Sequence, residues 1–462
     1  MTQQLQSNNN AALIVFTRGY TAMRVKTRME PALTSSQCSE VHRAFLLDIA
    51  TMCSNLSCKG VDIIISIAST DDGATRRVFS QSAVRFVEQA PGSFADRMTN
   101  AFTNTFAMGY KRVAIIGSDS PELTADCIMD VFERLKTKDA VFGPSTDGGF
   151  YLAGLSVAQP RLFGIDGYGT ANAMSNLEKR ARSMQLDYEL LSPMNDMDTL
   201  FDLQCLYSRL RSSQEKPQAT WGALMRLKDE GVPVAERSIS VVVPVYNEEK
   251  QIPALIENLG GMKPYCELLF VDGGSTDSTV HLLSPEFKVL QSVKGRGKQL
   301  NCGARASHGE LLLFLHADSR LPKGALAEVR RVLKTSSFGC FGIRFTSKRP
   351  AMICCSFLSN FRAKYRRTPF GDQGMFMERS LFNKLGGFKD LPLMEDYQMS
   401  LDLQELGVRP VLAHKRILTS SRRYDGSLFK QLGTMVHMGR LRKMYRDGKD
   451  PQYIASLYAD IR

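Results

Sequence analysis

Short apolar runs alternate along this chain with stretches in which apolar residues recur at helical spacing. Such alternation is typical of α/β units packed around a largely parallel sheet. The runs predict strands in the first half at 13–17, 61–68, 113–117 and 140–143. In the second half they predict strands at 239–243, 267–271, 288–290, 311–315 and 340–345.

A chain of 462 residues is too long for one ordinary core, so two domains are expected. The segment 206–237 is polar and helix-prone and contains no strand-like run. We therefore predict a first domain at 11–205, a linker at 206–237, a second domain at 238–425 and a helical extension at 426–462. Each half has an opening strand and a later strand that leads to an aspartate, a pattern that favours a weak internal duplication.

Composition narrows the class of protein. The apolar share of 43% and the charged share of 23% are typical of globular proteins, and no apolar run approaches the roughly 20 residues that span a bilayer. The N-terminus lacks the basic and apolar regions of a signal peptide. Ten cysteines without CxxC pairs suit reduced thiols, so we expect a cytoplasmic protein without a transmembrane segment.

The net charge of +12 is unevenly distributed. Residues 1–237 contain 25 basic and 26 acidic residues, whereas 238–462 contain 34 and 21. The positive field of the second half favours anionic partners, which include phosphorylated small molecules, nucleic acids and anionic membrane surfaces.

Polar residues follow the first two predicted strands of the second half. Turns at the carboxyl ends of parallel strands expose backbone N–H groups and commonly hold nucleotides. The alternative roles are structural: a helix N-cap with first-turn acids, and an Asx turn. The candidate nucleotide-binding residues in these turns are Pro244, Asn247, Glu248, Asp272, Gly273 and Gly274.

A basic loop and a carboxylate follow. Lys294, Arg296 and Lys298 precede Asn301 in KGRGKQLN and could clamp a diphosphate, although a solvated basic face is the commoner meaning of such a run. The strand at 311–315 then leads to Asp318, which could bind a ligand or simply cap the next helix.

The motifs PVYNEE, VDGGSTDST, GRGKQLN and HADS occur in this order at the spacing of successive βα units. In this order they resemble family 2 glycosyltransferases of the GT-A fold, over essentially 238–425. The resemblance implies a UDP- or GDP-linked sugar donor and Mg²⁺ or Mn²⁺ held by an Asp-x-Asp motif. Here His316 replaces the first acid, which leaves Asp318 as the predicted metal ligand. Either metal binding is then weaker, or His316 acts as a second ligand that would favour Mn²⁺ over Mg²⁺.

The same resemblance assigns roles near the end of this domain. It makes Asp396 the catalytic base and Glu395 its supporting neighbour, where the structural alternative is ordinary acid enrichment at a helix N-terminus. The turn 371–373 resembles the acceptor-side loop, and Arg422 and Arg423 could close over the phosphates or be surface cations. The basic tail beyond 426 would cover the acceptor site or meet an anionic surface.

The first half contains a related set of motifs. Alternating cations suit a polyphosphate or a solvated loop, and the acids that follow could form a metal site. The run over about 11–204 resembles a GT-A-like family close to nucleotidyltransferases, with an implied context in arsenosugar-type biosynthesis. It departs from that family in lacking a Pro-Gly loop before Lys-Thr-Arg. The candidates are Arg24, Lys26, Arg28 and Asp147 for the nucleotide, and Asp119 and Asp198, with Asp196 nearby, for the metal.

These features together predict a metal-dependent, inverting glycosyltransferase that moves a sugar from a nucleotide sugar to a small-molecule acceptor. One alternative is a bifunctional enzyme whose first domain makes the donor by nucleotidyl transfer. Another is a basic nucleic-acid-binding protein, which the absence of RRM, KH or zinc-finger patterns disfavours. The segment 349–367 is apolar and flanked by cations, so it suits peripheral contact with a membrane surface.

Overall fold

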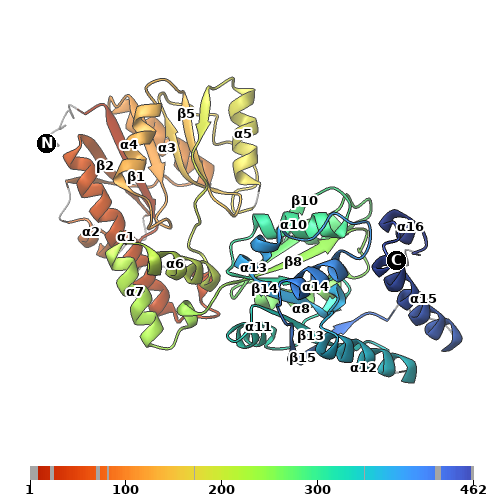
Figure 1. Cartoon of the computed structure of the whole chain (residues 1–462). Helices are drawn as coiled ribbons and strands as arrows, with labels where there is room; N and C mark the ends of the chain where they lie inside the picture. Colours follow the sequence, from red (N-terminus) through yellow and green to blue (C-terminus); the bar gives the residue numbers. More distant parts are fainter. Residues whose placement is uncertain are drawn as a thin grey trace. The chain divides into compact units, whose positions relative to one another are not determined.

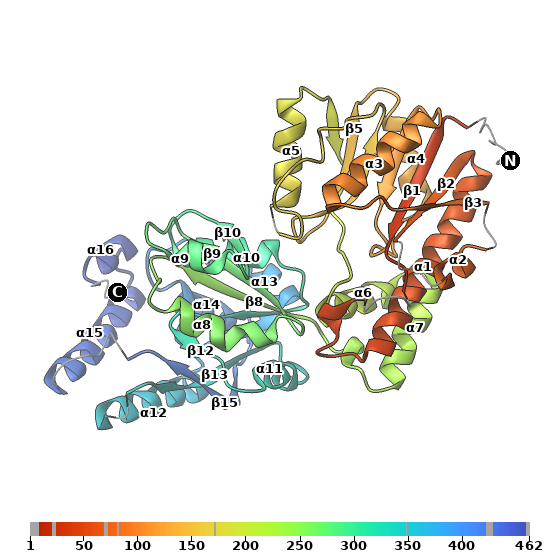
Figure 2. The same ribbon diagram turned by 180° about the vertical axis from the view of Figure 1, so that it is seen from behind.

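A computed structural model describes residues 9–20, 25–68, 73–80, 83–170, 172–347, 349–421 and 428–458. The chain forms two compact units, Met1–Ala235 and Glu236–Arg462 (Figures 1 and 2). Each unit has a central mixed sheet with helices on both faces, so the prediction of two tandem α/β domains is confirmed.

The first sheet has the spatial order β3-β2-β1-β4-β6-β5-β7. Neighbouring strands are parallel, except that β6 is antiparallel to both β4 and β5. The strands are β1 (Ala11–Thr17), β2 (Val61–Ile67), β3 (Val84–Glu88), β4 (Arg112–Ile116), β5 (Ala140–Pro144), β6 (Phe150–Leu155) and β7 (Tyr188–Leu190).

The second sheet repeats this order as β10-β9-β8-β11-β14-β13-β15, with the short β12 paired to the outer edge of β15. Here β14 is antiparallel to both β11 and β13. The strands are β8 (Ile239–Val245), β9 (Glu267–Asp272), β10 (Lys288–Gln291), β11 (Leu311–Phe314), β12 (Ser319–Arg320), β13 (Phe338–Phe345), β14 (Met375–Glu378) and β15 (Val411–Thr419). The matching topologies support the expected duplication, because Asp119 follows β4 and Asp318 follows β11, the fourth strand of each unit.

Helices cover both faces of each sheet. In the first unit, α1 (Ser35–Cys58), α2 (Ala74–Val78) and α4 (Ala125–Arg134) cover one face, and α3 (Phe94–Ala107) and α5 (Ala173–Ser183) cover the other. In the second, α8 (Ile252–Leu259), α9 (Thr279–Leu283), α11 (Ala325–Leu333) and α12 (Pro350–Tyr365) face α10 (Arg296–Ala306), α13 (Arg379–Leu385) and α14 (Glu395–Glu405) across the sheet.

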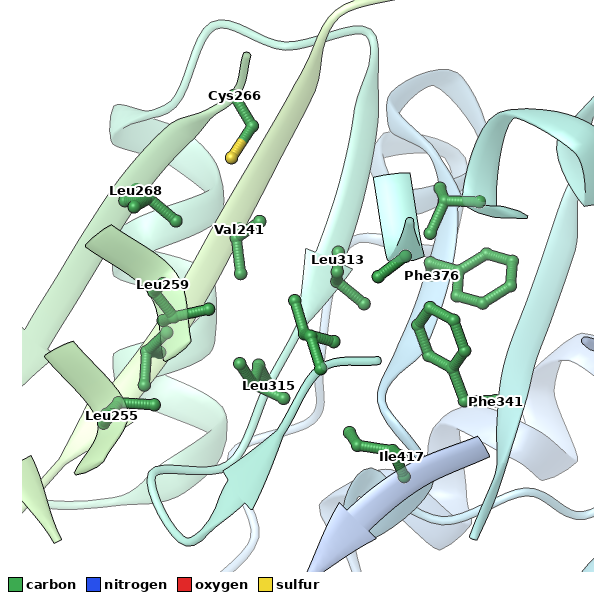
Figure 3. Close-up of a cluster of buried hydrophobic side chains, with 14 of the residues drawn as sticks. Val241, Leu255, Leu259, Cys266, Leu268, Leu313, Leu315, Phe341, Phe376 and Ile417 are labelled. Atoms are coloured by element: carbon green, nitrogen blue, oxygen red, sulfur yellow. The ribbon is translucent and has the colours of Figure 1, made fainter. Parts of the chain in front are cut away.

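The core of the second unit supports the strand ends that carry the candidate site. Val241, Leu313 and Leu315 pack with Leu255 and Leu259 of α8 on one face of the sheet (Figure 3). Leu311–Leu315 are fully or almost fully buried. Since burial of an apolar side chain contributes about 1.5–3 kcal/mol, this packing holds the residues that follow β11 rigidly at the sheet edge.

Most of the segment 206–237, expected to be a linker, belongs to the first unit, which ends at Ala235. It contains the end of α6 (Leu200–Ser212) and all of α7 (Gln218–Asp229), which bury Leu206, Leu210, Leu224 and Leu227. The Asp48 carboxylate on α1 accepts hydrogen bonds from the backbone N–H groups of Ala219 and Thr220 at 3.0 and 2.7 Å. The sequence hid this packing because polar residues separate the buried leucines along the chain.

In the second unit, α15 (Leu428–Arg446) and α16 (Pro451–Ser456) pack against the start of α14 through Leu441, Ile454 and Tyr397. Within the described part of the chain, no helix combines the length and the hydropathy needed to cross a bilayer.

Candidate active site

A cavity of about 590 Å³ opens where the carboxyl ends of β8 and β11 meet the start of α14. The candidate residues that line it come from separate segments of the second domain. They are Pro244, Glu248, Arg296, His316, Asp318, Glu395 and Asp396. The structure therefore brings together the proposed donor, metal and base residues of this domain.

Asp396 is held by two backbone groups. Gly371 N–H donates to its Oδ2 and Tyr397 N–H donates to its Oδ1, each over 2.7 Å. Met394, two residues before Asp396 and at the N-cap of α14, has φ of 72°, a left-handed conformation that is costly for a bulky side chain. Such strain occurs most often at functional sites, where the surrounding structure imposes it.

His316 lies beside this carboxylate. A Cβ atom added to Gly371 would lie 2.5 Å from His316 Nε2 and 3.2 Å from Asp396 Oδ2. Both side chains therefore approach the same point, and only glycine leaves room for them. The segment after β11, the turn before β14 and the start of α14 converge here.

Glu395 forms an ion pair with Arg296 at the entrance to α10. Arg296 Nη1 donates to Glu395 Oε1 over 3.0 Å, and the Glu395 side chain is only 3% exposed. The charge of Glu395 raises the pKa of Arg296, so the guanidinium stays charged. Burial raises the pKa of Glu395, and the Arg296 charge opposes that shift. The ion pair with Glu395 therefore fixes Arg296, which lines the cavity, as a positive charge.

The turn after β9 is built around Asp272. This buried carboxylate accepts hydrogen bonds from Gly274 N–H at 3.0 Å and from Ser275 N–H at 3.1 Å, which is an Asx turn. Gly274 has φ of 88°, which glycine adopts readily. The structure therefore supports the turn-forming role of Asp272.

Asn247 joins the turn after β8 to the turn after β9. Its N–H donates to Ser275 Oγ over 2.9 Å, and its Oδ1 accepts from Thr276 N–H over 2.8 Å. The Glu248 N–H is likewise bonded to Thr279 Oγ1 at 2.8 Å. These contacts position the two turns and leave the Glu248 side chain lining the cavity.

Three further polar residues of α10 have structural contacts. Asn301 donates to Phe388 O over 2.8 Å and accepts from Phe388 N–H over 2.9 Å. Lys298 pairs with Asp390 at 3.3 Å. Gln299, which the motifs did not single out, donates to the carbonyls of Val245 and Val271 at 2.8 Å each and packs against Gly273. The helix therefore fixes the ends of β8 and β9.

The far side of the cavity contains residues that no motif indicated. Arg362 of α12 lies 3.8 Å from the centre of the Phe370 ring, and Arg442 of α15 lies 5.3 Å from it. Met435, Met438, Ala455 and Tyr458 also line this side. The basic tail was the one sequence signal for this region, and its helices α15 and α16 do border the cavity.

Three candidate residues, Arg24, Arg422 and Arg423, lie outside the described residues.

Asp318 and His316 fit part of a metal site. Among the described His, Cys, Asp and Glu residues, no group of three could hold a metal ion. Mg²⁺ is commonly bound through one or two carboxylates, with substrate phosphates and waters completing its shell. The two side chains, both in the cavity lining, therefore fit an ion whose remaining ligands would come from a diphosphate and water.

The candidate metal ligands of the first domain are bridged by a lysine. Lys26 Nζ lies 2.8 Å from Asp119 Oδ1 and 3.1 Å from Asp198 Oδ1, and Arg28 lies 3.0 Å from Asp198 Oδ2. Burial alone would lower the pKa of Lys26, but the two carboxylates raise it above its ordinary value. This arrangement does not fit a divalent ion, because an ammonium group stands between the two acids.

The neighbouring acids of the first domain have unusual surroundings. Asp196 accepts hydrogen bonds from Ser120 Oγ at 3.1 Å and Ser145 Oγ at 2.9 Å, and burial, followed by the charge of Asp147, raises its pKa to about 7. Asp147 accepts from Gly149 N–H at 2.9 Å and so closes the turn before β6. Burial lowers the pKa of His42, near Asp119, to about 4.

Two family models match the chain. Residues 51–170 match "Uncharacterized protein conserved in bacteria (DUF2064)", and residues 240–384 match "Glycosyl transferase family 2". The second match covers β8–β11 and β14, together with Asp318 and the turn at Gly371.

Curated relatives and solved structures also resemble the chain. An undecaprenyl-phosphate 4-deoxy-4-formamido-L-arabinose transferase of Photorhabdus laumondii is 31% identical over 116 residues, 22% of this chain and 35% of the relative. An uncharacterized glycosyltransferase of Haemophilus influenzae is 29% identical over 34% of this chain and 53% of its own length. The chain thus spans about a third to a half of these relatives.

Two solved structures also match part of the chain. A "putative nucleotide-diphospho-sugar transferase" from Desulfovibrio desulfuricans G20 is 25% identical, with a TM-score of 0.44 over 48% of this chain and 96% of that one. A mannosyltransferase from Pyrobaculum calidifontis, in complex with GDP-Man and Mn²⁺, is 22% identical, with a TM-score of 0.35 over 48% of this chain and 69% of that one. On the two family matches, the chain joins an N-terminal DUF2064 domain to a C-terminal domain of glycosyl transferase family 2.

Proposed function

We propose that the C-terminal domain is an inverting glycosyltransferase that moves a sugar from a nucleoside-diphosphate sugar to an acceptor bound next to α15 and α16. The observation that carries the proposal is the convergence of Asp318, His316 and Asp396 on one cavity. The match to glycosyl transferase family 2 supports the reaction class.

The donor would bind at the ends of β8 and β9. The turns around Asn247 and Asp272 are held together by hydrogen bonds, and Glu248 faces the space that they border. Arg296, kept charged by Glu395, would bind the diphosphate. A Mg²⁺ or Mn²⁺ ion at Asp318 and His316 would neutralise charge on the departing nucleoside diphosphate when bound.

Asp396 would remove the proton from the attacking acceptor group. Its two backbone hydrogen bonds fix the carboxylate, so little reorganisation is needed when the acceptor binds. A single displacement at the anomeric carbon inverts its configuration. Arg362 and Arg442 on the far side of the cavity favour an acceptor that carries an anionic group. The family resemblance implies a context in arsenosugar-type biosynthesis, so small-molecule acceptors from that context are one class to test.

A thermal-shift screen of UDP- and GDP-sugars with Mn²⁺ and Mg²⁺ tests the donor site. We expect one nucleotide sugar to stabilise the wild-type protein and the Asp119→Ala variant, and to have no effect on Asp318→Ala. Asp119→Ala serves as the control because it removes the corresponding acid of the first domain. If no nucleotide sugar stabilises the wild type, or if Asp318→Ala responds as the wild type does, the proposed donor site is wrong.

A further inference from the structure

Helix α12 carries an exposed apolar stripe. Ile353, Phe357, Phe361 and Tyr365 recur every fourth residue, which places them on one face of the helix. Their exposed fractions are 61%, 67%, 44% and 61%. The rings of Phe357 and Phe361 lie 6.4 Å apart, and those of Phe361 and Tyr365 lie 4.6 Å apart. The side chains therefore form one continuous surface along the helix.

The opposite face of α12 packs against the core of the second unit. Met352 and Cys355 are buried in the core under the sheet. Cys355, Ser359 and Arg362 line the cavity. One helix thus separates the acceptor side of the cavity from the apolar stripe, and Leu358, which is exposed but also lines the cavity, lies at the rim between them.

The charge around α12 has one sign. The 43 residues from Val329 to Gly371 contain ten Lys or Arg residues and no Asp or Glu. Arg349 lies at the start of the helix, and Lys364, Arg366 and Arg367 lie at its end; all four are exposed. In both ribbon views α12 projects beyond β13 and β15 of its unit (Figures 1 and 2).

We propose that α12 docks in the plane of an anionic lipid bilayer, with its apolar stripe in the interface and its terminal cations on lipid phosphates. A helix of 16 residues is about 24 Å long and too polar at its ends to span, but it suits this interfacial geometry. Cations near an anionic membrane surface add to the apolar contribution. A second copy of the chain fits the stripe poorly, because a two-fold interface would place the cations of both copies against one another.

Docking by α12 would place the cavity rim at the bilayer surface. An acceptor carried by a membrane lipid could then reach Arg362 and Arg442 without leaving the bilayer. This statement about the acceptor rests on the proposed function, whereas membrane docking itself does not.

Vesicle sedimentation of the full chain tests the docking. We expect the protein to pellet with vesicles of phosphatidylglycerol and phosphatidylcholine and to stay in solution with phosphatidylcholine alone. In Phe357→Glu/Phe361→Glu, loss of apolar area and the added negative charge should lower partitioning about tenfold or more. Leu282→Glu/Val411→Glu is the matched control, since it adds the same charge at two exposed apolar positions elsewhere in the domain.

A second variant tests the contribution of the cations at the end of α12. Lys364→Gln/Arg366→Gln/Arg367→Gln keeps the stripe and should lower binding to the anionic vesicles. Both α12 variants should keep the donor-induced thermal shift, which would show that the fold and the proposed donor site are intact. The docking proposal is overturned if the wild type does not pellet or if both variants bind as it does. It is also overturned if the wild type forms a dimer that does not bind vesicles and that the Phe357→Glu/Phe361→Glu variant dissociates.

Discussion

Gly371 N–H donates a hydrogen bond to Asp396 Oδ2 over 2.7 Å. The same glycine packs against the imidazole of His316, so closely that an added methyl group would overlap Nε2. One residue without a side chain therefore sets the positions of the proposed base and of a proposed metal ligand. The proposed metal site and the proposed catalytic base therefore both lie next to Gly371.

Replacing Asp396 with Asn tests the proposed base. The amide keeps the size of the carboxylate but does not accept a proton, so we expect sugar transfer to slow by about 10²–10⁴-fold. Donor binding should be kept, because Asp318 and Arg296 are unchanged. The rate of transfer and the donor-induced thermal shift are the two measurements. Asp390→Asn, on a mostly exposed acid paired with Lys298, is the control. Turnover of Asp396→Asn at the wild-type rate would remove this residue from the mechanism.

Gly371→Ala tests whether the close approach of His316 and Asp396 to Gly371 is needed for sugar transfer. The added methyl group would force His316 or Asp396 to move, and a displacement of about 1 Å can reduce a rate by about 10²-fold. Overpacking of this kind also destabilises a fold by about 1–3 kcal/mol. Kinetics of sugar transfer and thermal unfolding should both change, whereas Gly261→Ala, where a new Cβ meets nothing within 4 Å, should leave both near wild type. Unchanged kinetics in Gly371→Ala would show that this contact does not position the site.

The central strands were predictable because parallel strands buried on both faces have continuous apolar sequences. The runs at 239–243 and 311–315 agree with β8 and β11 to within two residues. β15 was missed because the polar residues His414, Lys415 and Arg416 interrupt its apolar pattern and are exposed. β14 was missed because it leads directly into α13 at Arg379, so no turn residues mark the end of its short apolar run.

The site was predictable where its residues directly follow such strands. Asp318 comes after β11, and its place in the cavity agrees with the motif order. Arg362 and Arg442 gave no comparable signal, because they reach the cavity only through the packing of α12 and α15 in three dimensions. The role of Lys26 was also hidden, since its partners Asp119 and Asp198 are distant in sequence.

Asp196 should make the stability of the first domain depend on pH. Burial raises its pKa in the folded state to about 7 from an ordinary value of 3.8. The protonated acid is therefore favoured by folding, and its contribution is present below about pH 4 and lost as the pH rises through 7. We expect Asp196→Asn to gain about 2 kcal/mol relative to wild type between pH 5 and pH 8.

The fluorescence of Trp221 reports the stability of the first unit. This residue is the one tryptophan of the chain, it lies on α7 of the first unit, and it stacks on Tyr207 at 5.3 Å. Urea unfolding followed by its fluorescence at both pH values gives the free energy of unfolding of that unit. The same difference between variant and wild type at pH 5 and pH 8 would show that Asp196 does not titrate in this range.

Lys26 should act as an internal counter-ion in the position where the sequence suggested a metal. Its side chain is 4% exposed, whereas Asp119 and Asp198 are 40% and 33% exposed. In Lys26→Met the two acids lose their shared partner, although Asp198 keeps its pair with Arg28. We therefore expect the first unit to be destabilised by about 1–3 kcal/mol, less than for a fully buried pair. Lys59→Met, which breaks an exposed pair with Asp126, should change stability by at most about 1 kcal/mol.

The response of the same variants to Mn²⁺ distinguishes a counter-ion from a displaced metal site. In the wild type, Mn²⁺ should leave the Trp221 unfolding transition unchanged at pH 7.5, because the ammonium repels a divalent ion between the two acids. In Lys26→Met no ammonium group stands between the two acids, so Mn²⁺ should recover part of the lost stability. Stabilisation of the wild type and of Lys59→Met by Mn²⁺ would contradict this assignment, since it would mean that the first domain binds the ion with Lys26 in place.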